Sequence, residues 1–427
     1  QAAPPDVESA KRIVESALRE NRDTLTQIES KAVLRAFGIS VGDALTAASA
    51  GEAVQQAVAL GYPVALKIDS PDISHKSDID GIRLNLADDV AVRTAFDAIT
   101  GNARRLRPQA RISGVVVEKM LSSGQGRELM IGIVRDPVFG PAVVFAAGGT
   151  AAEVLRDRAL ELPPLNAPLT AAMIARTRVS RMLGAFRNLR PIDMPALEST
   201  LLRVSEMACE LPSIEELDIN PLIVDDRGVT AVDARIVVAA RHGTPRPYSH
   251  LAIHPYPAEM ITDGRLRDGE AFLLRPIRPE DAEMEQAFVR RLSPASRYFR
   301  FMGALRELTP AMLARFTQID YDREMAFVAV RRDKTGETEI GVARYISNPD
   351  GTSCEFAIVV DDAFQRRGLG RIMMQRLIEV ARARGLATMT GYVVTDNDGM
   401  LKLCSGLGFT IHHDRDDAGT RRAILQL

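Results

Sequence analysis

Apolar and polar positions in the first half of the chain follow two different periods. Short apolar runs of strand type alternate with segments in which apolar residues recur on one helix face. The expected strands are 64–68, 114–120, 129–134, 143–147 and 222–224. The expected helices are 6–37, 52–60 and 197–211. Strands and helices that alternate in this way predict an α/β fold with mixed sheets.

Prolines then interrupt the pattern. They are Pro245, Pro247, Pro255 and Pro257. Proline at this density favours extended, non-helical chain, so we expect a linker at 243–269. It would join a first domain, residues 1–242, to a second domain, residues 270–427, which opens with an expected strand at 271–276.

The second domain contains a strand, a glycine turn and a helix in close succession. Residues 355–360 have strand character, and residues 370–384 carry apolar side chains at helical spacing. The turn between them reads Gln365-Arg366-Arg367-Gly368-Leu369-Gly370, followed by Arg371. Backbone N–H groups without a partner at a helix N-terminus point outward and favour an anion. The glycines allow close approach to the backbone, and the arginines add positive charge.

This run matches the pattern Gln/Arg-x-x-Gly-x-Gly/Ala and resembles the pyrophosphate-binding motif of the GNAT acyltransferases. Asn397, Met400, Leu403 and the segment 407–409 resemble the second half of the same core. The resemblance implies acetyl-CoA as cosubstrate. The residues it implies at acetyl-CoA are Ile358, Val359, Val360, Gln365, Arg366, Arg367, Gly368, Leu369, Gly370, Arg371 and Asn397. The alternative is a glycine turn in an unrelated α/β protein.

Composition narrows the classes of function. The net charge of -2 gives no argument for nucleic acid or membrane binding, and the sequence has no apolar stretch long enough to span a bilayer. The 3 cysteines are far apart and lack metal-ligand spacing, which suits a reducing cytoplasm rather than a disulfide scaffold. The chain starts at Gln1 without an initiator Met, so we expect further residues upstream.

Three features of the first domain indicate nucleotide chemistry. Lys67 lies within an apolar expected strand, where a buried ammonium is costly unless an anion pairs with it. The polar segment 74–81 has the composition of a loop that closes over phosphates. Asn220 and Asp233 offer an amide oxygen and a carboxylate from two neighbouring segments, and Mg²⁺ prefers such oxygen ligands.

These motifs resemble the ATP-grasp domain of NDP-forming acyl-CoA synthetases over about residues 8–240, most closely in GYPVALKI, DPVFGPAVVF and ELDINPLIV. The resemblance implies binding of ATP and Mg²⁺. The implied roles are Lys67 at the ATP phosphates, Glu118 and Met120 at the adenine, Glu128 near the ribose and phosphates, and Asn220 and Asp233 as Mg²⁺ ligands.

One position departs from this pattern. Asp80 replaces the first glycine of a Gly-Gly pair, which adds negative charge and a Cβ where phosphate approaches the backbone. We therefore expect ATP binding without turnover, and the alternative is a retained fold without catalysis. His75 is interpreted as a loop residue rather than a phosphohistidine.

The segments 298–301 and 319–326 resemble the GNAT domain of bacterial protein lysine acetyltransferases (Pat), in which a GNAT domain follows an acyl-CoA synthetase part. The resemblance implies acetyl transfer to a protein lysine, with AMP-forming acetyl-CoA synthetase as target. It also implies Glu355 as general base, because a lysine ammonium of pKa about 10.4 must lose a proton before it attacks. Cys404 replaces the tyrosine acid of many GNAT proteins and is expected to be a packed helix residue.

Two other classes of function stay open. The chain could be a subunit of an ADP-forming acyl-CoA synthetase, although the parts expected to bind CoA and to carry the phosphohistidine lie outside these residues. It could also be a non-catalytic sensor of ATP and acetyl-CoA, although an intact Glu355 argues against this. The alternative for Glu355 itself is an exposed carboxylate on a strand face. Acyl-chain preference and oligomeric state are not predicted.

Overall fold

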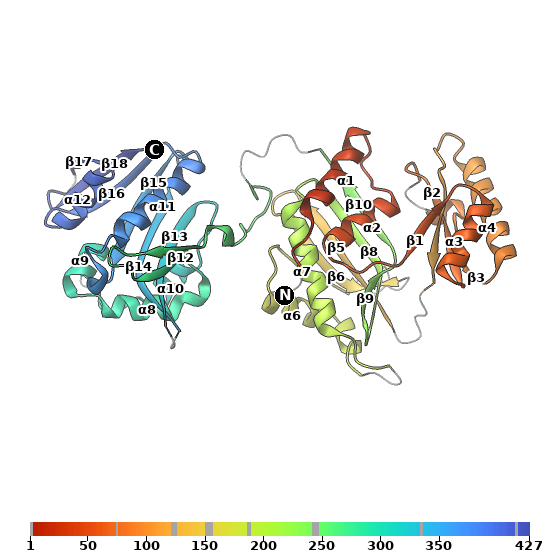
Figure 1. Ribbon diagram of the computed structural model, residues 1–427, viewed down its shortest axis with the longest axis horizontal. Helices are drawn as coiled ribbons and strands as arrows, with labels where there is room; N and C mark the ends of the chain where they lie inside the picture. The colour runs from red at the N-terminus through yellow and green to blue at the C-terminus, as the bar shows by residue number, and fades with distance from the viewer. Residues whose placement is uncertain are drawn as a thin grey trace. The chain divides into compact units, whose positions relative to one another are not determined.

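The chain forms two compact units, Gln1–Ile253 and His254–Leu427, in a computed structural model (Figure 1). The structure describes residues 3–73, 76–120, 126–149, 157–185, 189–240, 247–303, 305–333, 336–414 and 417–427. Both units combine helices and sheets, which confirms the expected α/β class. The described strand pairs of unit 1 are all antiparallel, whereas the sheet of unit 2 is mixed because β15 and β16 are parallel. Within the described residues, no helix is long and apolar enough to cross a membrane.

Unit 1 holds two sheets. The 4-stranded sheet has the order β1-β4-β2-β3, and the 6-stranded sheet has the order β10-β8-β5-β6-β7 with β9 paired to β8. The strands are β1 (Ala44–Ala47), β2 (Val64–Asp69), β3 (Ile82–Leu86), β4 (Gly114–Lys119), β5 (Arg127–Asp136), β6 (Gly140–Ala147), β7 (Arg158–Glu161), β8 (Ile214–Asp225), β9 (Gly228–Ala231) and β10 (Ala234–Val238). The helical segments are α1 (Val7–Arg19), α2 (Gln27–Ala36), α3 (Ala50–Leu60), η1 (Lys76–Ile79), α4 (Asp89–Leu106), α6 (Ala167–Ala175), η3 (Val179–Met182) and α7 (Met194–Glu210).

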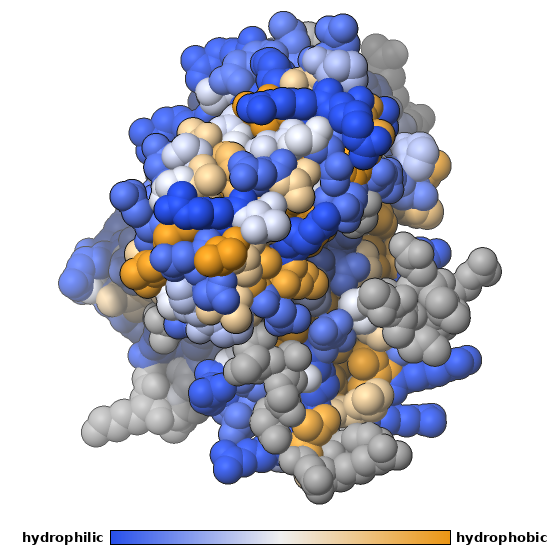
Figure 2. All heavy atoms as spheres, turned by 90° about the vertical axis from the view of Figure 1, so that its right-hand side faces the viewer, coloured by the Kyte–Doolittle hydropathy of each residue, from blue (hydrophilic) through white to orange (hydrophobic). Residues whose placement is uncertain are grey.

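Each sheet of unit 1 packs its own apolar core. Helices α3 and α4 cover the smaller sheet, whereas α1, α2 and α7 pack on the larger one (Figure 1). The side of the molecule that Figure 2 shows is mainly hydrophilic, and apolar residues appear there in small groups. Charged side chains on that side keep the exposed surface of the helices and strands solvated.

The single helix expected at 6–37 is wrong, because the chain turns between α1 and α2. Asn21 has φ 55, a left-handed conformation that interrupts a helix. Thr26 then caps α2, and its hydroxyl and the Glu29 carboxylate form a reciprocal capping box. The apolar spacing on the two sides of this turn is similar, which is why periodicity alone joined the two helices.

Unit 2 is built on an 8-stranded sheet of order β11-β12-β13-β14-β15-β16-β18-β17. The strands are β11 (Thr262–Arg265), β12 (Ala271–Pro276), β13 (Glu324–Asp333), β14 (Gly336–Ser347), β15 (Ser353–Val360), β16 (Thr388–Val394), β17 (Thr410–His413) and β18 (Thr420–Gln426). The helical segments are η4 (Ala258–Met260), η5 (Pro279–Asp281), α8 (Ala282–Arg291), α9 (Pro294–Phe301), α10 (Pro310–Thr317), η6 (Asp362–Phe364), α11 (Leu369–Ala383) and α12 (Asp398–Gly406).

The two faces of this sheet bury different cores, as the period of two along β13 requires. Phe327 and Ala329 pack in the cluster that includes α11, whereas Val328 and Val330 pack with α8 on the other face. The sheet is therefore covered on both faces, and α11 reaches across β13, β14 and β15 (Figure 1).

More than half of the expected linker belongs to unit 2. The division falls after Ile253, and residues 262–265 form strand β11, which pairs antiparallel with β12. Proline-rich extended chain is compatible with an edge strand, so composition did not separate the two. A separate linker therefore stays a prediction for residues 243–253 of the expected 243–269. Of these, residues 243–246 lie outside the described ranges.

Candidate functional site

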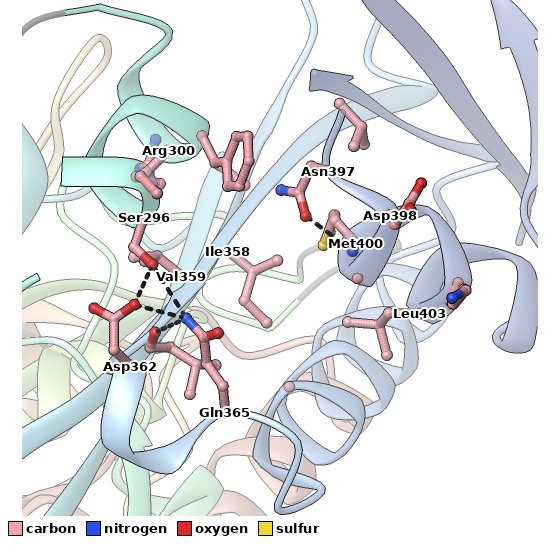
Figure 3. Close-up of a pocket in the computed structure, with 18 of the residues that line it drawn as sticks. Ser296, Arg300, Ile358, Val359, Asp362, Gln365, Asn397, Asp398, Met400 and Leu403 are labelled. Carbon is pink, nitrogen blue, oxygen red and sulfur yellow. Dashed lines mark hydrogen bonds between the residues drawn. The ribbon is translucent and has the colours of Figure 1, made fainter. Parts of the chain in front are cut away.

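A cavity of about 1020 Å³ opens in unit 2 between α9, β15, the start of α11 and the start of α12 (Figure 3). Its size is that of a pocket for a cofactor-sized ligand. Glu355 and residues 356–360 form one wall, and Gln365 to Arg371 contribute most of the turn before and into α11.

The strand pair beside this cavity separates. β15 and β16 are parallel and pair only at Ser353↔Thr388, Cys354↔Met389 and Glu355↔Thr390. β15 continues to pair with β14 as far as Gly341↔Val360, so its other edge stays in regular sheet. Within the described strands, the edge of β15 that faces β16 therefore has open hydrogen-bonding groups after Glu355, where an extended ligand can bind.

A glycine marks the point of separation. An added Cβ at Gly391, which follows Thr390 on β16, would lie 2.4 Å from the ring of Phe356. That ring packs edge-on against Phe409 at a centroid distance of 5.2 Å. The aromatic side chain thus fills the space beside β16 at the position where pairing ends.

The N-terminus of α11 has the features of an anion-binding site. Its N-cap residue, Gly368, has φ +95 and offers no side-chain cap, so the first backbone N–H groups of the helix are left for a ligand. Gly370 follows in a narrow place, where an added Cβ would lie 3.4 Å from Leu403. Arg366 and Arg371 are exposed at the rim and line the cavity.

Gln365 fixes the turn in place. Its Nε2 donates to the Ser296 hydroxyl at 3.1 Å and to the carbonyl of Val360 at 3.2 Å, and it lies 3.4 Å from an Asp362 carboxylate oxygen (Figure 3). Ser296 also donates to Asp362 at 2.7 Å. The end of β15, the turn and α9 are therefore joined by one polar network.

Glu355 is an exposed side chain on the cavity wall, at the last paired position of β15 and β16. Among the described residues, none donates a hydrogen bond to its carboxylate or forms an ion pair with it. A carboxylate in this place is free to accept a proton from an amine that enters the cavity.

Most of the residues predicted at acetyl-CoA meet around this cavity. Those that line it are Ile358, Val359, Val360, Gln365, Arg366, Gly368, Gly370, Arg371 and Asn397. The Leu369 side chain does not, because it is buried in the core under α11, but its backbone N–H is the first of that helix. The Arg367 side chain also points elsewhere, since it donates to Asp268 at 2.6 Å and to Glu270 at 2.5 Å.

Asn397 and Cys404 have structural roles on α12. The Asn397 side-chain oxygen caps the helix by accepting from the N–H of Met400 at 3.1 Å, while the residue lines the cavity (Figure 3). Cys404 is fully buried, as expected, and burial raises the pKa of its thiol to about 11. The thiol is therefore a core side chain rather than an acid in the cavity.

One wall of the cavity was missed from the sequence. It consists of α9 residues, and those with side chains of chemical interest are Ser293, Ser296, Phe299, Arg300 and Phe301. The run 298–301 was noticed for its resemblance, but nothing in one sequence places that helix beside β15. The sequence offered one signal for this wall, since Ser293, Ser296 and Arg300 are spaced for one face of a helix.

A second polar cluster lies in unit 1 around Lys67, which is buried as expected. Its Nζ lies 2.8 Å from a Glu118 oxygen and 3.1 Å from an Asp233 oxygen. Burial opposes the ammonium, but the two carboxylates hold the pKa of Lys67 above its usual value. The cluster joins β2 and β4 of the small sheet to the start of β10 in the large one.

Residues that the sequence analysis did not assign complete this cluster. Lys31 donates to Glu118 at 2.5 Å, and Gln27 donates to Glu118 at 2.7 Å and to Asp233 at 3.2 Å. Lys76 donates to the Gln27 side-chain oxygen at 2.8 Å. Both carboxylates are thus already bound by cations and an amide of the same chain.

These contacts bear on two predicted roles. The Glu118 side chain is buried at 5% exposure between two lysines, so it points into the cluster. Asp233 faces the lysines as well, which leaves its role as a Mg²⁺ ligand without support from geometry. Met120 is half-buried, and its N–H donates to the carbonyl of Pro63.

Glu128 and Asn220 meet at Gly149 instead. The Asn220 side-chain oxygen accepts from the N–H of Gly149 at 3.0 Å, and an added Cβ at Gly149 would lie 2.0 Å from the Glu128 carboxylate. Within the described residues, no group of His, Cys, Asp and Glu has the arrangement of a metal site. Mg²⁺ bound with ATP takes most of its oxygen ligands from phosphates and water, so a site with Asn220 and one carboxylate needs no such group.

Asp80 adopts φ 53, a left-handed conformation that glycine adopts readily. Its carboxylate accepts two hydrogen bonds of 2.6 Å from Arg83, which lower its pKa. The negative charge expected to repel phosphates is thus balanced by a neighbour. His75 lies outside the described residues.

Two protein families match the chain, one in each of its two units. The ATP-grasp domain family model matches residues 16–238, and the acetyltransferase (GNAT) family model matches residues 294–409. The chain belongs to the ATP-grasp family, and its C-terminal unit carries a GNAT acetyltransferase domain of the kind that uses acetyl-CoA.

Particular relatives resemble one unit each. The chain is 39% identical over 232 residues to the beta subunit of the ADP-forming acetate–CoA ligase I of Pyrococcus furiosus, which covers 54% of this chain and 99% of that protein. It is 41% identical over 153 residues to an acetyltransferase of Pseudomonas aeruginosa, covering 36% of this chain and 82% of the relative.

A solved structure extends the likeness of unit 1. Acetyl-coenzyme A synthetase 1 of Ca. Korarchaeum cryptofilum, in complex with coenzyme A and Ca-AMPCP, matches at a TM-score of 0.51 and 35% identity. The match covers 54% of this chain and 100% of that one. Of the longer ADP-forming acetate–CoA ligase I of Archaeoglobus fulgidus, the chain spans only 33%.

Proposed function

We propose that this chain is a protein lysine acetyltransferase of the bacterial Pat type, in which unit 2 transfers acetyl from acetyl-CoA to a lysine. The observation that carries the proposal is the position of Glu355, an exposed carboxylate at the mouth of a strand separation that leads to the open N-terminus of α11. Base, carbonyl site and anion site thus lie along one cavity.

The reaction follows from this arrangement. The pyrophosphate of acetyl-CoA lies at the first N–H groups of α11, beside Arg366 and Arg371. The pantetheine chain extends along the open edge of β15, where N–H groups of residues 358–360 are positioned to polarise the thioester carbonyl.

Glu355 takes a proton from the entering lysine ammonium, directly or through water. The neutral amine then attacks the carbonyl carbon, the C–S bond breaks, and CoA leaves as a thiolate that regains a proton from solvent. Cys404 takes no part, because it is buried in the core. Transfer is direct, so no acyl-enzyme forms.

We further propose the AMP-forming acetyl-CoA synthetase as a protein target, since its product is the acetyl donor and acetylation removes a lysine charge. The test incubates the full chain with labelled acetyl-CoA and that synthetase. Label on a synthetase lysine by mass spectrometry is the expected result. Label absent from every offered protein, with acetyl-CoA bound, would contradict a protein-acceptor reaction.

A second candidate is the ADP-forming acyl-CoA synthetase half-reaction, favoured by the 39% identity to a ligase beta subunit. The internal pairing of Lys67 argues instead that unit 1 binds ATP weakly and has a regulatory or scaffold role. We expect ATP to bind without release of ADP when acetate and CoA are added. Steady ADP release in a coupled assay would favour the synthetase.

A further inference from the structure

Arg300 lies on α9 and lines the same cavity as Glu355. Its guanidinium lies over the Phe301 ring at 5.0 Å and near the Phe316 ring at 5.8 Å from the centroid. No residue of the described ranges accepts a hydrogen bond from this guanidinium or forms an ion pair with it. The rings support the arginine while its N–H groups are left for something else.

Nearby charges act on Arg300 in opposite directions, since Glu285 attracts it and Arg344 repels it. Glu285 and Glu339 are buried nearby, and burial raises the pKa of Glu285 and raises that of Glu339 well above its usual range. The raised pKa values favour the protonated, neutral form of both carboxyls and so weaken their attraction for Arg300. A second arginine, Arg344, shares this region and donates to the Phe316 carbonyl at 2.5 Å.

Burial first, and then Arg344, lower the pKa of Arg300 to about 10, so it still carries its charge at pH 7. A cation in a partly buried cavity is unfavourable until an anion meets it.

The position of Arg300 is well fixed. Ser296 lies one helical turn earlier on α9 and is held by Asp362 and Gln365, which are part of the turn before α11 (Figure 3). In Figure 3, Arg300 and Asn397 lie on opposite sides of Ile358. The guanidinium thus forms part of the α9 wall, opposite the side where α12 begins.

We propose that Arg300 binds a carboxylate carried by a substrate of this cavity, a specificity that rests on the acyl transfer proposed above. A guanidinium presents a planar fork that matches a carboxylate with two parallel hydrogen bonds. The same chemistry has two sources. One is the distal carboxylate of a dicarboxylic acyl group on CoA, and the other is an acidic side chain beside the acceptor lysine.

The first arm of the test measures the acyl group. Binding of acetyl-CoA and succinyl-CoA to the full chain is compared by calorimetry for wild type, Arg300→Met and Arg300→Lys. Methionine keeps an unbranched stem against the rings and removes the fork, whereas lysine keeps the charge. If the acyl group supplies the carboxylate, the preference for succinyl-CoA over acetyl-CoA falls about 10- to 100-fold in Arg300→Met and less in Arg300→Lys. Arg376→Met, at a half-buried arginine of α11 that pairs with Glu379 and does not line the cavity, is the matched control and keeps the wild-type preference.

The second arm measures the acceptor. Acetyl transfer is compared for two short lysine peptides that differ only in Asp or Asn beside the lysine. If the acceptor supplies the carboxylate, Arg300→Met loses a wild-type preference for the Asp peptide through KM rather than kcat.

Wild-type preferences unchanged in both arms of Arg300→Met, with acetyl-CoA bound normally, would overturn this inference alone. A wild-type chain that binds neither acyl-CoA would overturn the proposed transferase together with it.

Discussion

Lys67 and Glu118 face each other across neighbouring strands of the small sheet, with Nζ and Oε2 2.8 Å apart and side chains 7% and 5% exposed. Glu118 also holds Lys31, so one buried carboxylate serves two ammonium groups. Loss of this carboxylate would leave two buried ammonium groups with less negative charge to compensate them, which is strongly destabilising.

Glu118→Gln should therefore destabilise unit 1 strongly. The amide keeps the shape but loses the charge, so Lys31 and Lys67 stay buried with too little compensation, at a cost of about 3–5 kcal/mol. Chemical denaturation followed by a unit 1 probe measures the effect. Glu8→Gln, which removes a 3.5 Å surface pair with Lys11, should leave stability unchanged. Equal midpoints for the two variants would show that the buried cluster contributes nothing.

Gly370→Asp should abolish acetyl-CoA binding while the fold persists. A carboxylate at the start of α11 repels the pyrophosphate, and its Cβ lies 3.4 Å from Leu403. Calorimetry on the folded variant checks the loss. Gly101→Asp is the control, since that helical glycine has open space around it. Affinity unchanged in Gly370→Asp would move the anion site away from α11.

Glu355→Gln should slow acetyl transfer about 10²–10⁴-fold, the range for loss of a general base. Affinity for acetyl-CoA should change little, because the amide has the size of the acid. Single-turnover rates across neutral pH provide the measurement. Glu379→Gln, an exposed change near the far end of α11, serves as control. Normal turnover in Glu355→Gln would assign proton removal to another group or to solvent.

The buried carboxyl pair of Glu285 and Glu339 should make the stability of unit 2 depend on pH. Burial, and then the nearby Glu285, raise the pKa of Glu339 in the folded state, so the folded state binds more protons than the unfolded state above about pH 4.5. Stability contributed at this site is therefore present at low pH and falls as pH rises toward the folded pKa. Glu339→Gln mimics the protonated form, so its Tm relative to wild type should increase from pH 5 to pH 8.

Glu337, two positions away on β14, offers a control of opposite sign. Although burial acts to raise the pKa of Glu337, Arg275 and Arg332 hold it below its usual value. Its contribution is present above the unfolded pKa and is lost as pH falls through the folded pKa. Glu337→Gln should thus cost stability near neutral pH and little in acid. A Glu339→Gln difference that is flat with pH would show that Glu339 ionises normally.

The parts of the site that are local in sequence could be predicted. The segment 355–384 places strand, turn and helix start next to one another along the chain, so periodicity and two glycines were enough to predict these elements, which line the cavity. The same locality does not tell in which direction each side chain points. Alternate residues of a turn point in different directions, and Leu369 enters the core while Arg367 turns toward Glu270.

Partners that are distant in sequence could not be predicted. Lys67 was expected to need an anion, but the Asp233 that meets it lies 166 residues further along the chain. Arg300 is similar, since only the packing of α9 beside β15 brings it to the cavity. Tertiary packing decides whether a charged side chain is exposed, paired or left facing a ligand.

The short pairing between β15 and β16 determines how a bound ligand would affect the sheet of unit 2. Three residue pairs join β11–β15 to the block formed by β16, β18 and β17, so the sheet of unit 2 is two sub-sheets with a narrow seam. A ligand that bonds to the open edge of β15 completes this seam, in the manner of an inserted strand. We expect bound acyl-CoA to extend the sheet along this edge, so the amides among residues 356–360 that face it, rather than β14, should exchange hydrogen more slowly.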